Sequence, residues 1–373
     1  MAKRQCPDAA ARAGAILEID LAGIVANWRL LAELAAPAQC AAVVKANGYG
    51  LGAAPVACAL AAAGCRMFFV ATLDEAIALR QALGARPEIA VLNGIFSGTA
   101  GEFVRHQLTP VLNDPGQIME WRSAGSRHPA IVQLDTGLAR LGLAAAEFAA
   151  LVERPPPVLW RAVMSHLACS DCPGHPHNET QRARFAAAAS RLPGVKASLA
   201  ASSGIFLGAP YHFDLVRPGA ALYGVNPQPG RTNPLRQVVR LCGRIVQVRQ
   251  IDRGEPVGYG AAHVMEAPGR IATVAVGYAD GWLRSLGHRG CGHLAGTRVP
   301  LIGRVSMDLV TFDVSAAAPA AAHAGAMIEL LGAQYGVDDA AADGGTIGYE
   351  ILTALGARYH RVYRDPPPAA LPE

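Results

Sequence analysis

Short apolar, β-type runs alternate with alanine-rich stretches of helical length over residues 20–225, and this alternation constrains the fold most strongly. Gly, Pro, Asn or Asp stand at many of the joints. Eight runs are predicted to be strands: Ala41–Val44, Met67–Val70, Ile89–Leu92, Thr109–Leu112, Ala130–Leu134, Trp160–Met164, Ala197–Leu199 and Asp214–Val216. Strands of this number with helices between them predict an α/β fold, a closed parallel (β/α)8 TIM-type barrel.

The pattern changes after about residue 236, where β-branched stretches are joined by turns. No segment of helical length is expected there before Gly348–Arg358. We therefore predict a barrel at 18–236 followed by a mostly antiparallel β domain at 237–373, with an N-terminal segment at 1–17 that could pack with the β domain. The prolines at 366–368 predict an extended end.

Composition excludes several classes of protein. The chain has 373 residues, long enough for two domains, and its net charge of +4 is spread without a basic block, so we expect neither nucleic acid nor an anionic membrane as a partner. Charged residues interrupt any apolar run that could form a signal peptide or a membrane-spanning helix. Eight cysteines without regular spacing suit reduced thiols, and we expect a cytoplasmic protein.

Lys45 stands where the first predicted strand opens into the loop KANGYG. A lysine at a strand end usually extends its ammonium into water. In a barrel of this type, however, the chemistry lies at the carboxyl ends of the strands, and a lysine amine there can form an imine with the carbonyl of pyridoxal phosphate. Ser202 and Gly219 follow the seventh and eighth predicted strands, where barrels often bind phosphate, and Tyr49 could add a hydroxyl.

Several motifs occur in an order and at distances that together are specific. They are EIDLAGIVANWRLL at 18–31, VVKANGYGLG at 43–52, LDTGLARLG at 134–142, SHLACSD at 165–171, FDLVRPGAALYG at 213–224, GYGAA at 258–262, VGYADGW at 276–282 and GRVSMDLV at 303–310. Through these motifs the chain resembles the alanine racemase family of pyridoxal-phosphate enzymes over almost its whole length. That family has a barrel followed by a β domain, which agrees with the pattern of the residues.

The resemblance implies a role for each matching residue. It makes Lys45 the lysine that forms the imine with pyridoxal 5'-phosphate and Tyr259 the second catalytic base. The other residues that it implies are Arg217 at the pyridine nitrogen, His166 beside it, Tyr49, Ser202 and Gly219 at the phosphate, Arg140 and Met307 at the substrate or near the tyrosine, and Gln133, Tyr278 and Asp308 in supporting or entrance positions. No metal is expected.

Two bases suit a racemase, because a proton must leave one face of the reacting carbon and return to the other. A tyrosine serves as a base at neutral pH only where cations stabilise its phenolate, and Arg140 and Arg217 with His166 could do so. An arginine at the pyridine nitrogen keeps that nitrogen largely unprotonated, so the ring is a weaker electron sink and side reactions are disfavoured. The resemblance implies interconversion of L- and D-alanine, supplying D-alanine for peptidoglycan, in a head-to-tail homodimer with shared sites.

The sequence departs from the family pattern at three places. Gln133 replaces a lysine that, in the family the chain resembles, is often carbamylated. We therefore expect the Gln133 amide to hold Arg140, with chloride as a candidate for the missing anion, and activity that does not respond to bicarbonate. Ala200 and Ala201 precede Ser202 where many members have Ala-Asn, which predicts a roomier pocket. Near the C-terminus, Ala357 or Tyr359 aligns with a tyrosine that binds the phosphate in many members.

Other functions remain open at this stage. A racemase of serine or of broad specificity is the main alternative, because a pocket for a methyl group discriminates a hydroxymethyl group only weakly. A non-catalytic pyridoxal-phosphate carrier would lack the β domain, and a decarboxylase of diamino acids would be expected to carry a cysteine and an aspartate that find no convincing match. The residues Cys169, Cys172, His175 and His177, with His166, form the nearest approach to a zinc site.

Overall fold

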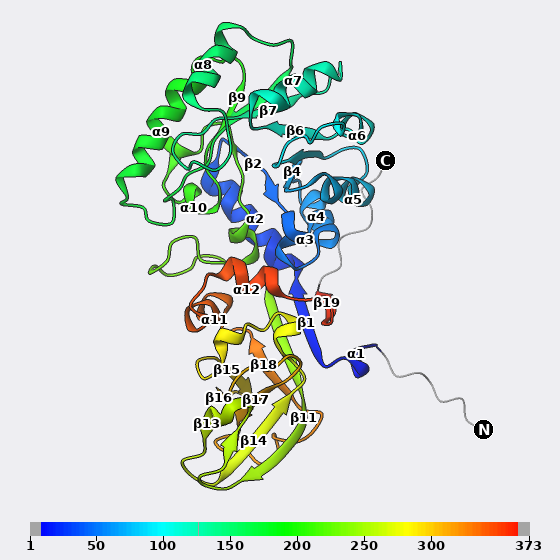
Figure 1. Cartoon of the computed structure of the whole chain (residues 1–373), viewed down its shortest axis with the longest axis vertical. Coiled ribbons are helices and arrows are strands. Elements are labelled where there is room, and N and C mark those ends of the chain that lie inside the picture. The colour runs from blue at the N-terminus through cyan, green and yellow to red at the C-terminus, as the bar shows by residue number, and fades with distance from the viewer. Residues whose placement is uncertain (1–8, 126, 365–373) are drawn as a thin grey trace, which may run out of the picture. The chain divides into compact units, whose positions relative to one another are not determined.

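The computed structural model describes residues 9–125 and 127–364 of the chain (Figure 1). The chain divides into two compact units: Ala22–Arg236 form one, and the described residues before and after that range form the other. The proline-rich stretch at 366–368 lies outside the described residues.

The first unit is built on short parallel strands that follow one another around a barrel. They are β2 (Gln39–Cys40), β3 (Ala42–Val43), β4 (Met67–Val70), β5 (Glu88–Val91), β6 (Thr109–Leu112), β7 (Ala130–Gln133), β8 (Trp160–Met164), β9 (Lys196–Ser198) and β10 (Leu215–Val216). Strands β3 to β9 pair in chain order, and β10 pairs with β2. The amide of Asp214 donates to Ala197 and that of Arg217 to Ala200, so the last strand also bonds to the β9 side and the barrel closes.

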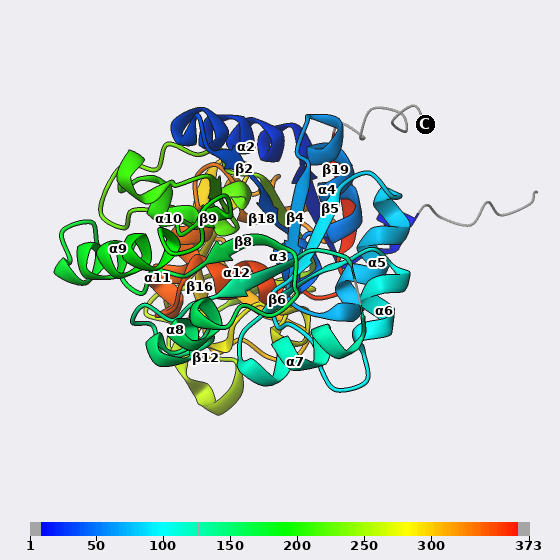
Figure 2. The same cartoon turned by 90° about the horizontal axis from the view of Figure 1, so that it is seen from above.

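Helices connect these strands and lie around them (Figure 2). They are α2 (Leu21–Ala35), α3 (Lys45–Tyr49), α4 (Ala53–Ala62), α5 (Leu73–Leu83), α6 (Ala100–Arg105), α7 (Pro115–Ser123), α8 (Ala145–Glu153), α9 (Pro176–Ala189) and α10 (Ser202–Ile205), with the short 3-10 turns η1 (Ala209–Tyr211) and η2 (Ala220–Tyr223). The sequence specifies where α7 begins: Asp114 caps the helix by accepting from the Gln117 amide at 3.0 Å, and Pro115 is its first residue.

The predicted barrel is confirmed, and three strands begin and end at the expected residues, namely β4, β6 and β8. Within the first expected strand, Ala41–Val44, only Ala42–Val43 form a strand, β3, and the short strand β2 precedes it at Gln39–Cys40. Ala41, between them, still donates its amide to the carbonyl of Val216 at 3.0 Å. Most strand positions are buried because helices cover the barrel outside, and most of the strand residues are therefore apolar.

The second unit is a mostly antiparallel closed sheet. Its strands are β1 (Ala15–Asp20), β11 (Val239–Ile251), β14 (Gly269–Val274), β15 (Cys291–Leu294), β16 (Thr297–Ile302), β17 (Val310–Asp313), β18 (Met327–Leu331) and β19 (His360–Arg364), and a hairpin adds β12 (Pro256–Val257) and β13 (His263–Val264). The order is β14-β17-β16-β15-β18-β11-β1-β19, and β14 also pairs with β11, which closes the sheet. Only the β1–β19 pair in this sheet is parallel.

Helical segments in this unit differ from the expectation. They are α1 (Ala9–Arg12), α11 (Val337–Gly344), α12 (Gly348–Ala354) and the 3-10 turns η3 (Tyr259–Ala261), η4 (Tyr278–Asp280) and η5 (Arg284–Leu286). The expected absence of a helix before Gly348 was wrong, because Asp339 accepts from the Gly336 amide and starts α11. The helix expected over Gly348–Arg358 ends at Ala354, and soon after it the amide of Gly356 bonds instead to the carbonyl of Asp280 at 2.9 Å.

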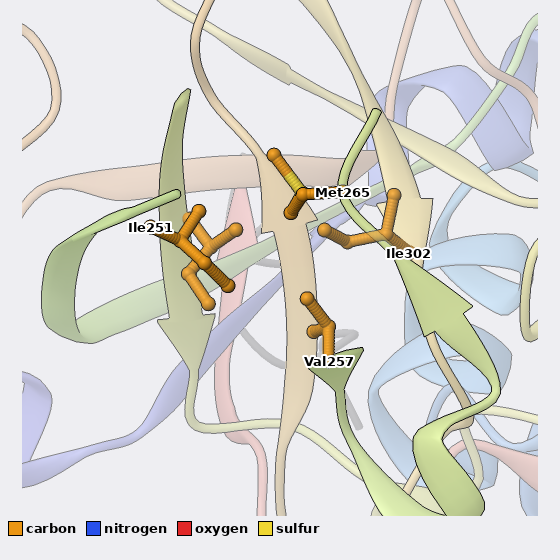
Figure 3. Close-up of a cluster of buried hydrophobic side chains, with 5 residues drawn as sticks. Ile251, Val257, Met265 and Ile302 are labelled. Carbon is orange, nitrogen blue, oxygen red and sulfur yellow. The ribbon is translucent and has the colours of Figure 1, made fainter. Parts of the chain in front are cut away.

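A small apolar cluster in this unit lies beside the β12–β13 hairpin (Figure 3). Its members are Ile251, Val257, Met265, Ile271 and Ile302, all at least nine-tenths buried. Val257 belongs to the first strand of the hairpin and Met265 follows the second, so the cluster fixes both ends of the hairpin to the sheet.

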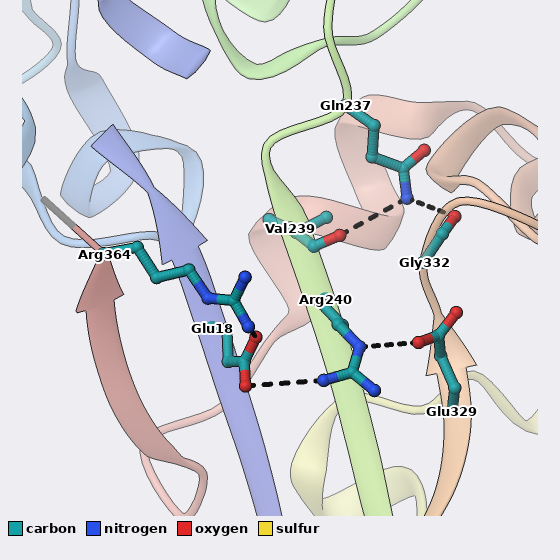
Figure 4. Close-up of polar contacts among 7 residues, drawn as sticks. All are labelled: Glu18, Gln237, Val239, Arg240, Glu329, Gly332 and Arg364. Atoms are coloured by element: carbon teal, nitrogen blue, oxygen red, sulfur yellow. Dashed lines mark hydrogen bonds and ion pairs between the residues drawn. The ribbon is translucent and has the colours of Figure 1, made fainter. Parts of the chain in front are cut away.

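Cross-strand ion pairs run over four neighbouring strands of the same sheet (Figure 4). Glu18 on β1 pairs with Arg364 on β19 and, at 3.5 Å, with Arg240 on β11. Arg240 also pairs with Glu329 on β18 at 2.6 Å. The Gln237 amide donates to the carbonyls of Val239 and Gly332 near the start of β11. These contacts add side-chain order to a sheet that the backbone bonds already define.

In the described ranges, none of the helices has the length and apolar character needed to span a membrane.

Candidate active site

Lys45 stands at the end of β3 and opens a turn with an unusual backbone. Ala46, Asn47, Gly48 and Tyr49 all have positive φ angles, between 52° and 64°, so α3 is a left-handed turn. Only one of the four is glycine, and for the others this conformation costs about 1–2 kcal/mol each. Strain of this kind persists only where surrounding contacts impose it, and it is concentrated at functional sites.

Glu75 supplies one of those contacts. Its carboxylate accepts from the amide of Ala46 at 2.6 Å and from the amide of Ala71 at 2.8 Å. Sequence reasoning missed this residue, although Thr72 and Glu75 form the Thr-x-x-Glu pattern of a helix capping box, which the structure contains. The cap of α5 thus also holds the backbone beside Lys45.

The environment of Lys45 favours its neutral amine. Burial lowers the pKa of the Lys45 ammonium, the positive charge of Arg140 lowers it further, and Glu75 partly opposes both. A neutral amine is the form that attacks a carbonyl or accepts a proton. The structure therefore brings Lys45 and Arg140 into one electrostatic environment, as expected for a shared site.

Arg217 is a fully buried cation just after β10. Its guanidinium donates to the hydroxyl of Ser198 and, at 2.7 Å, to the carbonyl of Ser165. Burial lowers the pKa of Arg217 to about 10, so the group stays protonated at neutral pH. Ser198 and Ser165 were not predicted, because a serine within an apolar strand carries no local signal for an arginine far along the chain.

His166 completes a group of basic side chains at this end of the barrel. Burial lowers the pKa of His166 to about 3, and the nearby charges of Arg217, Arg140 and Lys45 act in the same direction. The imidazole is therefore neutral at physiological pH and can both donate and accept a hydrogen bond. An anionic ligand would be favoured beside the two guanidinium groups of Arg217 and Arg140.

Tyr49, Ser202 and Gly219 lie together, as predicted. The Ser202 hydroxyl accepts from the amide of Gly219 at 3.0 Å and from the amide of Ala221 at 3.2 Å. A Cβ atom at Gly219 would collide with the hydroxyl of Tyr49, whose ring stacks on Tyr223 at 4.8 Å. Amides and hydroxyls converging where no side chain fits make a suitable phosphate cradle. With Lys45 and Arg217, these residues fit pyridoxal phosphate.

Gln133 does not hold Arg140 as expected. Its amide donates to the carbonyl of Leu141 at 3.1 Å, and within the described residues no hydrogen bond joins it to Arg140. The cause is local: the Asp135 carboxylate accepts from the amides of Gly137, Leu138 and Ala139 and folds the segment into a tight turn. Arg140 follows that turn and is exposed. The Gln133 amide thus supports the backbone beside Arg140 rather than its guanidinium.

Tyr259 lies in the second unit, at the tip of the β12–β13 hairpin. Its side chain is 73% exposed in the single chain. Gly258 and Gly260 on either side have φ angles of 73° and 71°, which a side chain would make unfavourable. The apolar cluster anchors the two arms of the hairpin (Figure 3). The hairpin therefore holds the exposed Tyr259 side chain in a fixed position.

Tyr278, Met307 and Asp308 belong to two loops that are bonded to each other. The amide of Tyr278 donates to the carbonyl of Ser306 at 3.0 Å, and that of Ala279 to the carbonyl of Met307 at 3.0 Å. A side chain at Gly277 would collide with the backbone of Met307. The expected entrance residues Tyr278 and Asp308 and the expected substrate residue Met307 therefore lie in two joined loops of the second unit.

The possible zinc segment forms a different structure. His175 caps α9 through its ring nitrogen and the amide of His177, and Asn178 donates to the carbonyls of Cys169 and Cys172. In residues 9–125 and 127–364, no three His, Cys, Asp or Glu side chains come together as metal ligands. The segment gives no support to a zinc site.

Tyr359, one of the two candidates for the C-terminal phosphate residue, is 4% exposed and lies with the second unit. Its hydroxyl has no hydrogen-bond partner in the described part of the chain. Burial is the main cause that raises the pKa of this phenol, so it stays protonated.

Comparison with known proteins identifies relatives of the whole chain. The family described as alanine racemase, N-terminal domain, matches residues 19–227, and that described as alanine racemase, C-terminal domain, matches residues 238–363. An alanine racemase of Rhodospirillum rubrum is 53% identical over 360 residues, covering 94% of this chain and 96% of that protein. A catabolic alanine racemase of Mesorhizobium japonicum is 50% identical over 364 residues, covering 96% and 95%. The crystal structure of alanine racemase from Bartonella henselae with covalently bound pyridoxal phosphate is 41% identical, with a TM-score of 0.90, and the match covers 94% of this chain and all of that one.

Proposed function

The chain belongs to the alanine racemase family, and from that premise we propose that it interconverts L-alanine and D-alanine with Lys45 and Tyr259 as its two bases. It is a pyridoxal-phosphate-dependent isomerase. The observation that carries the assignment of Lys45 is its place at the head of a strained left-handed turn, where burial and Arg140 favour the neutral amine. A merely structural lysine would need neither feature.

Pyridoxal phosphate fits the residues of the barrel unit. Lys45 would bind its aldehyde carbon, Tyr49, Ser202 and the amide of Gly219 its phosphate, and Arg217 its pyridine nitrogen. When bound, the group withdraws electrons from the α-carbon of an amino acid and makes the α-proton easier to remove. Arg217 keeps its own proton at neutral pH, so it would donate to the ring nitrogen without protonating it.

The two bases divide the proton transfer between the two faces of the α-carbon. The Lys45 amine accepts the proton on one face and the Tyr259 oxygen supplies one on the other, and the roles exchange in the reverse direction. Arg140 would bind the substrate carboxylate, and Met307 would line the space beside the substrate methyl group. His166, neutral at the working pH, would link the cations by hydrogen bonds without adding charge.

We further propose a head-to-tail homodimer in which the second unit of one chain brings Tyr259 to the barrel of its partner. The exposure of the Tyr259 side chain in the single chain supports this arrangement, since a catalytic group needs a partner surface around it. We also place the enzyme in the cytoplasm, and the seven described cysteines, all free, support a reducing compartment.

Two substitutions test the assignment of the bases. Tyr259→Phe removes only the phenol oxygen, so the cofactor should stay bound, with its absorbance unchanged, while racemisation falls by at least about 10³-fold. Lys45→Ala should remove the imine absorbance itself. Equal racemisation rates for Tyr259→Phe and the parent would refute the role of the tyrosine, and an unchanged spectrum in Lys45→Ala would refute that of the lysine.

A further inference from the structure

Arg358 bridges two acidic side chains from different loops of the second unit. Its Nε and Nη2 atoms donate to the two carboxylate oxygens of Asp280, at 2.6 Å and 2.8 Å. Its Nη1 atom donates to Oδ1 of Asp308 at 2.7 Å. Sequence reasoning gave Arg358 no role, because it follows a helix and no motif marks it.

Asp280 fixes the loop that carries Tyr278. Its side chain is buried, and besides Arg358 it accepts from the amide of Gly277 at 2.9 Å. Its carbonyl accepts from the amide of Gly356 at 2.9 Å, close to Arg358 along the chain. The two-pronged contact with a buried carboxylate gives the guanidinium a definite orientation, which a flexible surface arginine would lack.

Asp308 is the exposed end of this bridge. It lies in a turn that closes on itself, because the Ser306 amide donates to the carbonyl of Leu309 at 3.0 Å and the Leu309 amide to the Ser306 hydroxyl at 3.1 Å. Asp308 and Arg358 are each about half exposed, at 57% and 51%, and an ion pair of this exposure adds little to folding stability. The ion pair matters more for the position of the turn than for stability, since it joins the turn that carries Met307 to the oriented guanidinium of Arg358.

We propose that Arg358 is a positioning residue for the racemase: by bridging Asp280 and Asp308 it holds the Tyr278 loop and the Met307–Asp308 turn in one arrangement at the substrate entrance. The inference rests on the proposed function, because it takes the family resemblance to place Tyr278 and Asp308 at the entrance and Met307 beside the substrate. The guanidinium of Arg358 is engaged by the carboxylates of Asp280 and Asp308, so its loss should affect the capture and discrimination of the substrate more than the chemical step.

The chain contains a matched control for this bridge. Arg240 also joins two carboxylates, those of Glu329 and Glu18, and its side chain is 47% exposed, close to the value for Arg358. It lies on β11, and neither of its partners belongs to the entrance loops. Arg240→Ala therefore removes a comparable bridge from the same unit without releasing Tyr278 or Met307.

Steady-state racemisation of L-alanine by the holoenzyme tests the proposal. Arg358→Ala should raise KM about 10-fold with kcat within about 2-fold of the parent, and Arg240→Ala should leave KM unchanged. Arg358→Lys keeps the positive charge but cannot donate to both oxygens of Asp280 and to Asp308 at once. Its KM should therefore resemble that of Arg358→Ala. The KM ratio of L-serine to L-alanine should also fall in Arg358→Ala, because a loosened entrance discriminates less by size.

A double-mutant cycle with Asp308→Asn separates positioning from a general loss of structure. Asp308→Asn keeps the Arg358–Asp280 pair and the fold, and should raise KM by itself, so it remains informative if Arg358→Ala does not fold. Adding Arg358→Ala to it should raise KM by less than 2-fold more. The inference would be overturned if the KM increases of the two single variants multiplied in the double variant, or if either single variant kept the parental KM. It would also be overturned if Arg240→Ala raised KM as much as Arg358→Ala. If instead Tyr259→Phe retained full turnover, the proposed function itself would fail.

Discussion

His166 makes a pH dependence measurable at the scale of one residue. Its pKa is lowered to about 3 in the folded chain, from an ordinary value of 6.5, so between these pH values the unfolded chain binds a proton that the folded chain does not. Stability should therefore fall as the pH decreases from 6.5 toward 3, by roughly 2 kcal/mol at pH 5 from this group. His166→Gln should lose less stability than the parent over this range, as measured by denaturant unfolding at several pH values. Parallel pH curves for the two proteins would contradict this origin.

Other residues show what local sequence can and cannot reveal. Lys45, Tyr49, Ser202, Arg217 and Gly219 were predicted because strand ends and a family resemblance marked them, and the structure gathers them in the barrel unit. The left-handed backbone after Lys45 was not predicted, since three of its four residues favour other conformations. Glu75, which bonds to this left-handed backbone, and Ser198, which bonds to the Arg217 guanidinium, act through contacts between distant parts of the chain.

Among the secondary-structure elements, the β12–β13 hairpin joins an apolar cluster to the proposed catalytic residue Tyr259. Met265→Ala would leave a cavity in the cluster that anchors the hairpin, at a cost of about 2–5 kcal/mol. Because a displacement of about 1 Å at a catalytic group can cost 10²-fold in rate, kcat should fall at least about 10-fold as Tyr259 loses its fixed position. Leu330→Ala, on β18 away from the hairpin, should lower the melting temperature similarly with little change in kcat. Equal kcat losses in both variants would mean that general destabilisation is responsible.

Elements were predictable where a repeating pattern covered them. The barrel strands are mostly apolar because most of their residues are buried, so most of their positions could be read from the sequence. In the second unit, α11 was missed because its Ala- and Asp-rich sequence resembles a loop, and its start depends on the cap by Asp339. Strand β19 has an intermediate burial pattern without alternation, and only its pairing with β1 defines it.

For the whole molecule, the sequence pattern predicted two architectures, and only the family resemblance implied how one site could use both. Lys45 and the phosphate cradle belong to one unit, and Tyr259 and the Arg358 bridge belong to the other. If Lys45 and Tyr259 are the two bases, as we propose, a reaction that needs one base on each face of the α-carbon needs residues of both units at one site. Two chains arranged head to tail would meet this requirement twice, once at each barrel.

Co-expression of two inactive variants tests this arrangement. With Lys45→Ala in one tagged chain and Tyr259→Phe in the other, a heterodimer with shared sites has one site in which both bases are intact and one in which both are missing. After purification through both tags it should show about half of the kcat of a dimer of two tagged parental chains, since closed two-fold symmetry gives two equivalent sites. If both bases of a site came from the same chain, every site of the heterodimer would lack one base. Its activity would then stay at the level of the two inactive homodimers, and the head-to-tail site would be refuted.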